Sequence, residues 1–198
     1  MNSSIHHLPP FRAATLALLV GCATLVGCTT TGPDVHANPA VARQEIHSGV
    51  NATLSRLYQA APGSEQLVSH ARGVLVFPEV KSASFVVGAE HGDGALRVSG
   101  ENAGYFSLTG GSIGWQAGAQ SKAVVIVFLT PEALAKFRDS NGWTIGADAN
   151  VAVAKIGANG SIDTMTAQQP VVQFVLNNLG LTAGVSLQGS KISRIRLG

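Results

Sequence analysis

Glycine is concentrated in the second part of this chain, where it separates short runs of Val, Ile and Phe. Of the 23 glycines in the 198 residues, 18 lie between Gly73 and Gly198. The apolar runs recur about ten residues apart, a spacing typical of antiparallel strands joined by short turns. Glycine within a strand serves bends, bulges or a close approach of backbones. We therefore expect an α+β protein: a single β-rich domain with a curved antiparallel sheet or partial barrel, decorated by about three helices.

Ten apolar runs are expected to be strands because they are rich in Val, Ile and Phe. They are Val74–Phe77, Phe85–Ala89, Leu96–Ser99, Tyr105–Leu108, Ile113–Ala119, Val124–Leu129, Val151–Ile156, Val171–Leu176, Thr182–Leu187 and Ile192–Leu197. One helix interrupts them: Thr130-Pro131-Glu132 has the form of a cap, a first-turn proline and a favourable acid, followed by Ala133–Arg138.

A longer helix is expected to begin at Asn38-Pro39 and to end at Pro62-Gly63. Its apolar residues recur at spacings of four and three and so share one face: Ala42, Ile46, Val50, Leu54, Leu57 and Ala61. This face could pack on the sheet or enter a bilayer. The helix carries few basic residues, which favours packing. Ser64 could cap a shorter helix that runs to about Arg72.

A repeated tetrapeptide, Leu19-Val20-Gly21-Cys22 and Leu25-Val26-Gly27-Cys28, lies in and after the apolar run Ala13–Val26. It resembles the lipobox of bacterial lipoproteins, which implies cleavage before a cysteine that carries a diacylglycerol. Cys28 is the preferred site, because Cys22 would leave a short apolar region. The alternatives are an ordinary secretory signal with two stray cysteines and a cytosolic apolar helix.

The expected organisation is a signal peptide over 1–27, a flexible tether over 28–38 and a folded domain over 39–198. Thr29 follows Cys28, in place of the Asp of inner-membrane lipoproteins. The resemblance therefore implies a lipid anchor in the outer membrane, with the domain in the periplasm or exposed at the cell surface. Without Arg12, 12 basic residues stand against 11 acidic ones, which argues against a nucleic-acid partner.

Three segments resemble the SYLF domain, also known as the Ysc84 actin-binding domain. They are Ala71–Pro78 with Phe85–Gly88 and Gly92–Gly94, then Gly110–Gln120, and finally Gly180–Ser190. The resemblance covers roughly Val41 to Leu197 and implies a β-rich domain that binds phospholipids. It also implies actin binding in some eukaryotic members, a partner that is not expected for a bacterial envelope protein. Two departures, Ser82-Ala83-Ser84 and His91, fall near a segment that could face lipid headgroups.

The cluster His91-Gly92-Asp93-Gly94 allows two interpretations. A histidine two residues from an aspartate could begin a metal site or a pair in which the carboxylate orients a base. Asp-Gly is also a strong hairpin signal, and a tight turn is the interpretation that we prefer. No nucleophile elbow, Walker lysine pattern or His-Glu-x-x-His motif is present, so we expect no enzyme activity, no cofactor and no metal.

Basic residues supply the candidate lipid-binding groups, because they can hold phosphates through charge-assisted hydrogen bonds. The candidates are Lys81, Lys122, Lys191, Arg194 and Arg196. Arg194 and Arg196 are expected on one face of the last strand. An ordinary solvated strand face would explain these residues equally well. Trp115 and Trp143 could be interfacial anchors or core residues. The expected function is phospholipid binding at a membrane, and the alternative is a structural or protein-interaction module of the cell envelope.

Overall fold

The structure, a computed structural model, describes residues 38–84, 87–113, 118–155, 162–178, 180–182, 185 and 187–197. Val35–Gly198 forms one compact unit with its own hydrophobic cores, as expected for a domain that folds on its own. The predicted signal peptide, both cysteines and the tether up to residue 37 lie outside the described residues. No helix among the described residues is long and apolar enough to cross a membrane.

Four helices lie in the described residues: α1 (Pro39–Ala60), α2 (Ser64–Ser69), α3 (Pro131–Asp139) and α4 (Thr164–Ala167). The predicted starts of α1 and α3 are confirmed, because the side chains of Asn38 and Thr130 accept hydrogen bonds from the first-turn amides. The prediction for α2 is corrected. Gly63 precedes this helix in the left-handed conformation, and the Ser64 hydroxyl donates to the Leu57 carbonyl oxygen instead of capping. Helix α4 was not predicted from the sequence.

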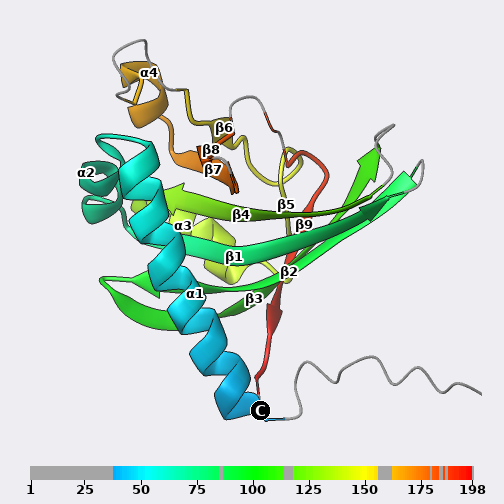
Figure 1. Cartoon of the computed structure of the whole chain (residues 1–198). Coiled ribbons are helices and arrows are strands. Elements are labelled where there is room, and N and C mark those ends of the chain that lie inside the picture. The colour runs from blue at the N-terminus through cyan, green and yellow to red at the C-terminus, as the bar shows by residue number, and fades with distance from the viewer. Residues whose placement is uncertain are drawn as a thin grey trace, which may run out of the picture. The chain divides into compact units, whose positions relative to one another are not determined.

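The strands form one curved sheet (Figure 1) in the order β5-β9-β3-β2-β1-β4-β7-β6, with β8 paired to β7. Their bounds are β1 (Gly73–Ser84), β2 (Val87–Val98), β3 (Glu101–Ile113), β4 (Gly118–Phe128), β5 (Trp143–Thr144), β6 (Ala152–Val153), β7 (Val171–Asn177), β8 (Gly180–Leu181) and β9 (Lys191–Ile195). The α+β prediction is confirmed. The sheet is mixed and not wholly antiparallel, because β6 runs parallel to β7.

The predicted turn at His91–Gly94 is wrong, because these residues lie inside β2. The turn that follows β2 is at Ser99-Gly100, where both residues have positive φ values of 53° and 83°. Gly92 and Gly94 serve a close approach instead. A Cβ on Gly92 would collide with the Glu79 carbonyl oxygen, and one on Gly94 would collide with that of Val76. Glycine is required at both positions because the register of β1 with β2 shifts between Val76 and Lys81, and this shift brings the backbone of β1 close to β2.

Two cores lie on opposite faces of the sheet, because side chains alternate along each strand. On β4, Val124, Ile126 and Phe128 point to one core, and Val125 and Val127 point to the other. The first core is aromatic and is closed by α3; it contains Phe106, Phe128, Phe137 and Trp143. The second core is covered by α1, whose predicted apolar face packs on the sheet.

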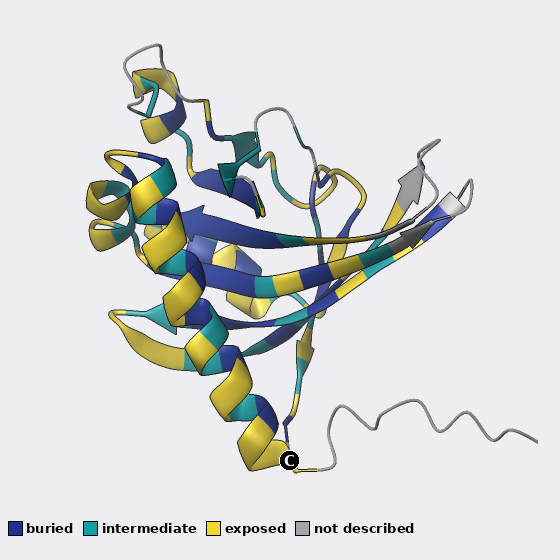
Figure 2. Cartoon of the chain, in the orientation of Figure 1, coloured by how far each residue is buried: buried dark blue, intermediate teal, exposed yellow. Residues whose placement is uncertain are grey.

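The strands β1–β4 are longer than the part of the sheet that α1 covers. Figure 2 shows buried residues where these strands pass beneath the helix and mainly exposed or intermediate ones where they continue beyond it. Polar contacts hold α1 in place: His47 Nε2 lies 2.8 Å from the Tyr105 hydroxyl, and Arg97 donates to Asn51 over 2.7 Å. The sheet face on the side of α1 therefore has a covered part and an open part.

Candidate functional site

A row of polar side chains crosses the open part of the sheet on the side of α1. The register aligns Ser121 with Lys81, Lys81 with His91, His91 with Thr109, and Thr109 with Lys191. Residues directly opposite each other on neighbouring strands share a face, so these five side chains form one line over β4, β1, β2, β3 and β9. We call Ser121, Lys81, His91, Thr109 and Lys191 the cross-strand row. All five residues are exposed.

Two members of the row, Lys81 and His91, each lie beside a carboxylate. Lys81 Nζ is 3.2 Å from Glu79 Oε2, and the two side chains are 74% and 55% exposed. His91 Nε2 is 3.5 Å from Asp93 Oδ1. An exposed ion pair such as Lys81–Glu79 contributes about 0–1 kcal/mol, so a ligand anion can replace Glu79 beside Lys81. The row can therefore offer ammonium and imidazole groups to an anion that lies on the sheet.

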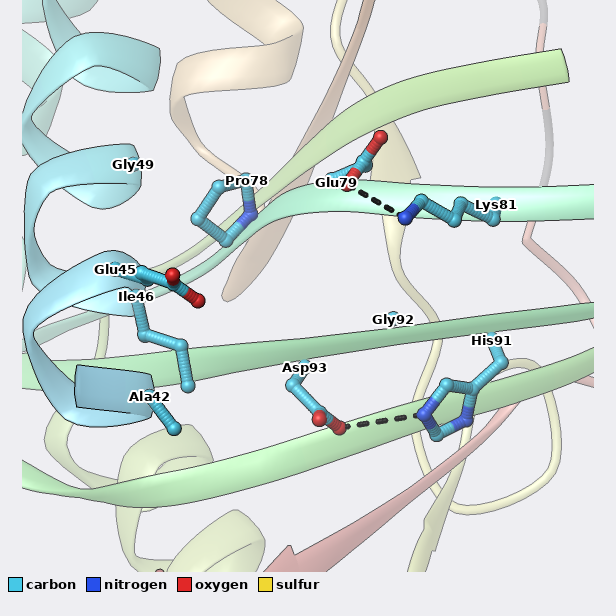
Figure 3. Close-up of a pocket in the computed structure, with 10 residues that line it drawn as sticks. All are labelled: Ala42, Glu45, Ile46, Gly49, Pro78, Glu79, Lys81, His91, Gly92 and Asp93. Atoms are coloured by element: carbon cyan, nitrogen blue, oxygen red, sulfur yellow. Dashed lines mark ion pairs between the residues drawn. The ribbon is translucent and has the colours of Figure 1, made fainter. Parts of the chain in front are cut away.

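Two hollows lie beside the row and share His91 and Asp93 in their linings. The first hollow has a volume of about 480 Å³ and lies between α1 and strands β1 and β2. The second has a volume of about 450 Å³ and is lined by Pro39, Ser107 and Arg196 among others. Figure 3 shows the first hollow, with Glu45 and Ile46 extending from α1 and the His91–Asp93 pair on β2. Volumes of this size suit small ligands or parts of larger ones.

Of the predicted lipid-binding residues, the structure brings Lys81 and Lys191 together in the row. Lys122 lies on the other face of the sheet, opposite Val80 of the aromatic core. Its Nζ is 2.9 Å from both carboxylate oxygens of Glu90, and its side chain is only 19% exposed. Lys122 therefore neutralises a partly buried carboxylate and is not placed with Lys81 and Lys191.

The expected pairing of Arg194 with Arg196 is corrected. Arg194 lies over the Phe106 ring, with its guanidinium carbon 5.1 Å from the ring centroid, on the face of the aromatic core. Arg196 follows the last residue of β9 and lines the second hollow, on the side of α1. The alternation of side chains holds only within a strand, and β9 ends at Ile195. Arg196 is thus the predicted arginine that lies near the row.

The His91–Asp93 pair exists, but on a strand and not in a turn. The described residues contain no group of three or more His, Cys, Asp or Glu that could hold a metal ion. Trp143 is a core residue at 1% exposed, while Trp115 lies outside the described residues. In the part of the sheet that α1 covers, burial raises the pKa of Tyr58 above its ordinary value, with the Glu65 charge adding to the rise and Arg97 opposing it.

The sequence pointed to His91 near a segment that could face lipid headgroups, but it did not connect His91 with Thr109 and Glu45 in one site. His91 and Thr109 join the row through the register of β2 with β3, and no local pattern shows that register. Glu45 lines the first hollow because Gly49 lets α1 approach Pro78 of β1 closely. The helical periodicity placed Glu45 off the apolar face, which is a signal for exposure but not for a site.

One comparison with known proteins gives a match. Residues 109–196 match the model of the family Ysc84, described as "Las17-binding protein actin regulator". The matched segment contains Thr109 and Lys191 of the row but not Lys81 or His91. No curated protein matches the chain. The match runs from β3 to the residue after β9 and agrees with the motifs over Gly110–Gln120 and Gly180–Ser190. The match over residues 109–196 is consistent with a SYLF-domain protein, and SYLF domains are binding domains.

Proposed function

We propose that this domain is a non-enzymatic module that binds phospholipid through the cross-strand row. The observation that carries the proposal is the alignment of Lys81, His91 and Lys191 on the open part of the sheet. At a strand spacing of about 4.8 Å, Lys81 and Lys191 are separated by about 14 Å along the sheet. Such a line of cations and hydroxyls can contact more than one lipid phosphate on a membrane surface.

The shape and composition of the open face support the same function. The row combines two lysines and a histidine with the hydroxyls of Ser121 and Thr109, all donors to phosphate oxygens. No long helix in the described part of the chain covers these residues, and Gly111 and Ala89 beside them are exposed and small. An array of short side chains with two lysines can lie against a lipid surface without deep insertion.

Vesicle flotation of the chain from Thr29 tests this proposal. The double variant Lys81→Gln/Lys191→Gln keeps polar side chains but removes two charges. Each basic residue near an anionic surface is worth about 1 kcal/mol, so we expect binding to phosphatidylglycerol vesicles to weaken about tenfold to thirtyfold. The difference should shrink at high salt, because screening acts on exposed charge.

A matched control removes the same charge elsewhere. Arg138 lies in the last turn of α3 and Lys155 follows β6; both are exposed and neither belongs to the row. The variant Arg138→Gln/Lys155→Gln should bind vesicles nearly as the parent does. Equal losses in both double variants would show a net-charge effect and would contradict a site at the row.

A lipid anchor at Cys28 is a second part of the proposal. The tether and the domain would then sit at the outer membrane, and the row would orient the domain or sense lipid after attachment. Mass spectrometry of the protein from its native membrane should find a diacylated N-terminus at Cys28. A modified Cys22 would move the site, and an unmodified secreted chain would overturn the lipoprotein assignment.

A protein-interaction module is the competing function, because the family description names Las17 binding and actin regulation. The same flotation experiment separates the two. Complete absence of binding across anionic and zwitterionic vesicles would contradict lipid binding and favour a protein partner. Binding that the row variant abolishes and the control preserves would favour lipid.

A further inference from the structure

The open face is charge-balanced rather than basic. Besides Lys81, Lys191 and Arg196, it carries three carboxylates, Glu45, Glu79 and Asp93, which line the first hollow. Glu79 and Asp93 are paired with Lys81 and His91. The Glu45 carboxylate takes part in no hydrogen bond or ion pair among the residues that the structure describes. A ligand with phosphate alone would leave this carboxylate uncompensated beside it.

The first hollow places Glu45 above an apolar floor. Ala42, Ile46 and Pro78 supply most of this floor, and the nearby Gly92 adds no side chain. In Figure 3 the Glu45 side chain extends from α1 into the space between the helix and the strands, across from Lys81 and His91. Among the described residues, the hollow thus offers an unpaired carboxylate on the helix side, Lys81 and His91 with their carboxylate partners on the strand side, and apolar surface between them.

We infer that the first hollow binds the headgroup of a zwitterionic phospholipid that carries a primary ammonium, of the phosphatidylethanolamine class. The Glu45 carboxylate accepts hydrogen bonds from the ammonium group, and Lys81 at the rim donates to the phosphate. The two methylene groups between phosphate and ammonium lie on Ile46 and Pro78. This inference rests on the proposed phospholipid binding and adds the class of lipid.

The lining also favours a primary over a quaternary ammonium. Quaternary ammonium groups are recognised mainly by cages of aromatic rings. The described lining of the first hollow contains no Phe, Tyr or Trp, and its one aromatic ring is that of His91. A carboxylate, by contrast, gains charge-assisted hydrogen bonds only from an ammonium with N–H groups. Phosphatidylcholine has the same net charge as phosphatidylethanolamine but lacks these donors, so it is the matched comparison lipid.

The test measures vesicle binding of the chain from Thr29 with two lipid mixtures. Both contain the same fraction of phosphatidylglycerol, and the remainder is phosphatidylethanolamine in one and phosphatidylcholine in the other. The parent protein should bind the ethanolamine mixture about two- to fivefold more tightly, the range of an exposed ion pair. Glu45→Gln should reduce this ratio to about one. Glu101→Gln, at an exposed site beside the Ser99-Gly100 turn, should keep the parent ratio.

The outcomes separate this inference from the proposed function. Ethanolamine and choline lipids also differ in how they pack, but a packing effect would persist in Glu45→Gln. An equal affinity of the parent for both mixtures, or a preference that survives Glu45→Gln, would overturn the inference while leaving binding through the row intact. The parent could bind both mixtures equally while Lys81→Gln/Lys191→Gln loses vesicle binding. That result would support binding through the row and overturn the preference for ethanolamine lipids. Thermal unfolding of each variant checks that the domain remains folded.

Discussion

At the scale of single residues, two glycines show why local chemistry misled the interpretation of this chain. Asp93-Gly94 has the sequence of a hairpin turn, yet both residues lie inside β2. Gly92 and Gly94 are glycines because the backbone of β1 approaches them from the neighbouring strand. A turn signal depends on adjacent residues, whereas this requirement comes from residues about fifteen positions away in the sequence. The turn in the structure is at Ser99-Gly100, and its sequence signal is a dipeptide just as Asp93-Gly94 is.

Gly94→Ala is therefore expected to destabilise the domain by about 1–3 kcal/mol, because the new methyl group would collide with the Val76 carbonyl oxygen. Chemical denaturation measures the change in the free energy of unfolding. Gly111→Ala is the matched control: it lies on the neighbouring strand β3, and the nearest atom to its Cβ would be 4.0 Å away. The control should change stability by less than about 0.5 kcal/mol. Equal effects of the two substitutions would show that β2 does not need glycine for close approach.

Local sequence signals were also insufficient to distinguish the roles of the charged residues. Lys81 and Lys122 looked equivalent in the sequence, since both lie near predicted strand ends. Pairing of β1 with β4 places Lys122 opposite Val80 and Ser121 opposite Lys81, so adjacent residues of β4 face opposite sides. Lys122 then meets Glu90 on one face, while Lys81 remains on the open face. A sequence can identify cations, but only the register distinguishes a structural ion pair from a group that is available to a ligand.

At the scale of elements, α1 and α3 could be predicted because capping and helical periodicity are local properties. Asn38-Pro39 and Thr130-Pro131 mark the starts of both helices. The long strands β1–β4 were predicted too short, because apolar runs mark only the parts that lie in the cores. The predictions Val151–Ile156 and Ile192–Leu197, by contrast, run past the ends of β6 and β9. β1 continues to Ser84 and β4 begins at Gly118, where polar and small residues replace the apolar ones. The unpredicted part of the sheet is therefore the same part that carries the cross-strand row.

The helix α1 also determines where the candidate site lies. It buries Val50 and Leu57 against the sheet and leaves the strand segments beyond it open. Its contact of Gly49 with Pro78 brings Glu45 to the edge of the open face. The helix thus forms one wall of the first hollow as well as the cover of the second core. Both roles of α1 follow from packing of its apolar face on the sheet, and neither involves entry of this face into a bilayer.

At the scale of the whole molecule, positive and negative charges nearly balance, and the charged side chains are divided between the two faces of the sheet. The chain has a formal net charge of +2, so no overall basic field would draw it to anionic surfaces. On the open face, short-range contacts at Lys81, Lys191 and Glu45 would have to provide recognition. On the other face, the aromatic core and the Lys122–Glu90 pair maintain the fold. The central claim of this account is that membrane contact occurs on the first of these faces only.

Fluorescence quenching measures that contact most directly. The chain from Thr29 lacks both native cysteines, so single labelling sites can be introduced at Ser121→Cys in the row and at Ala135→Cys on α3. Both positions are exposed in the structure. We predict that lipids with a spin label on the headgroup will quench the fluorophore at position 121 strongly and the one at position 135 little. Equal quenching at both sites, or stronger quenching at position 135, would contradict phospholipid binding through the cross-strand row.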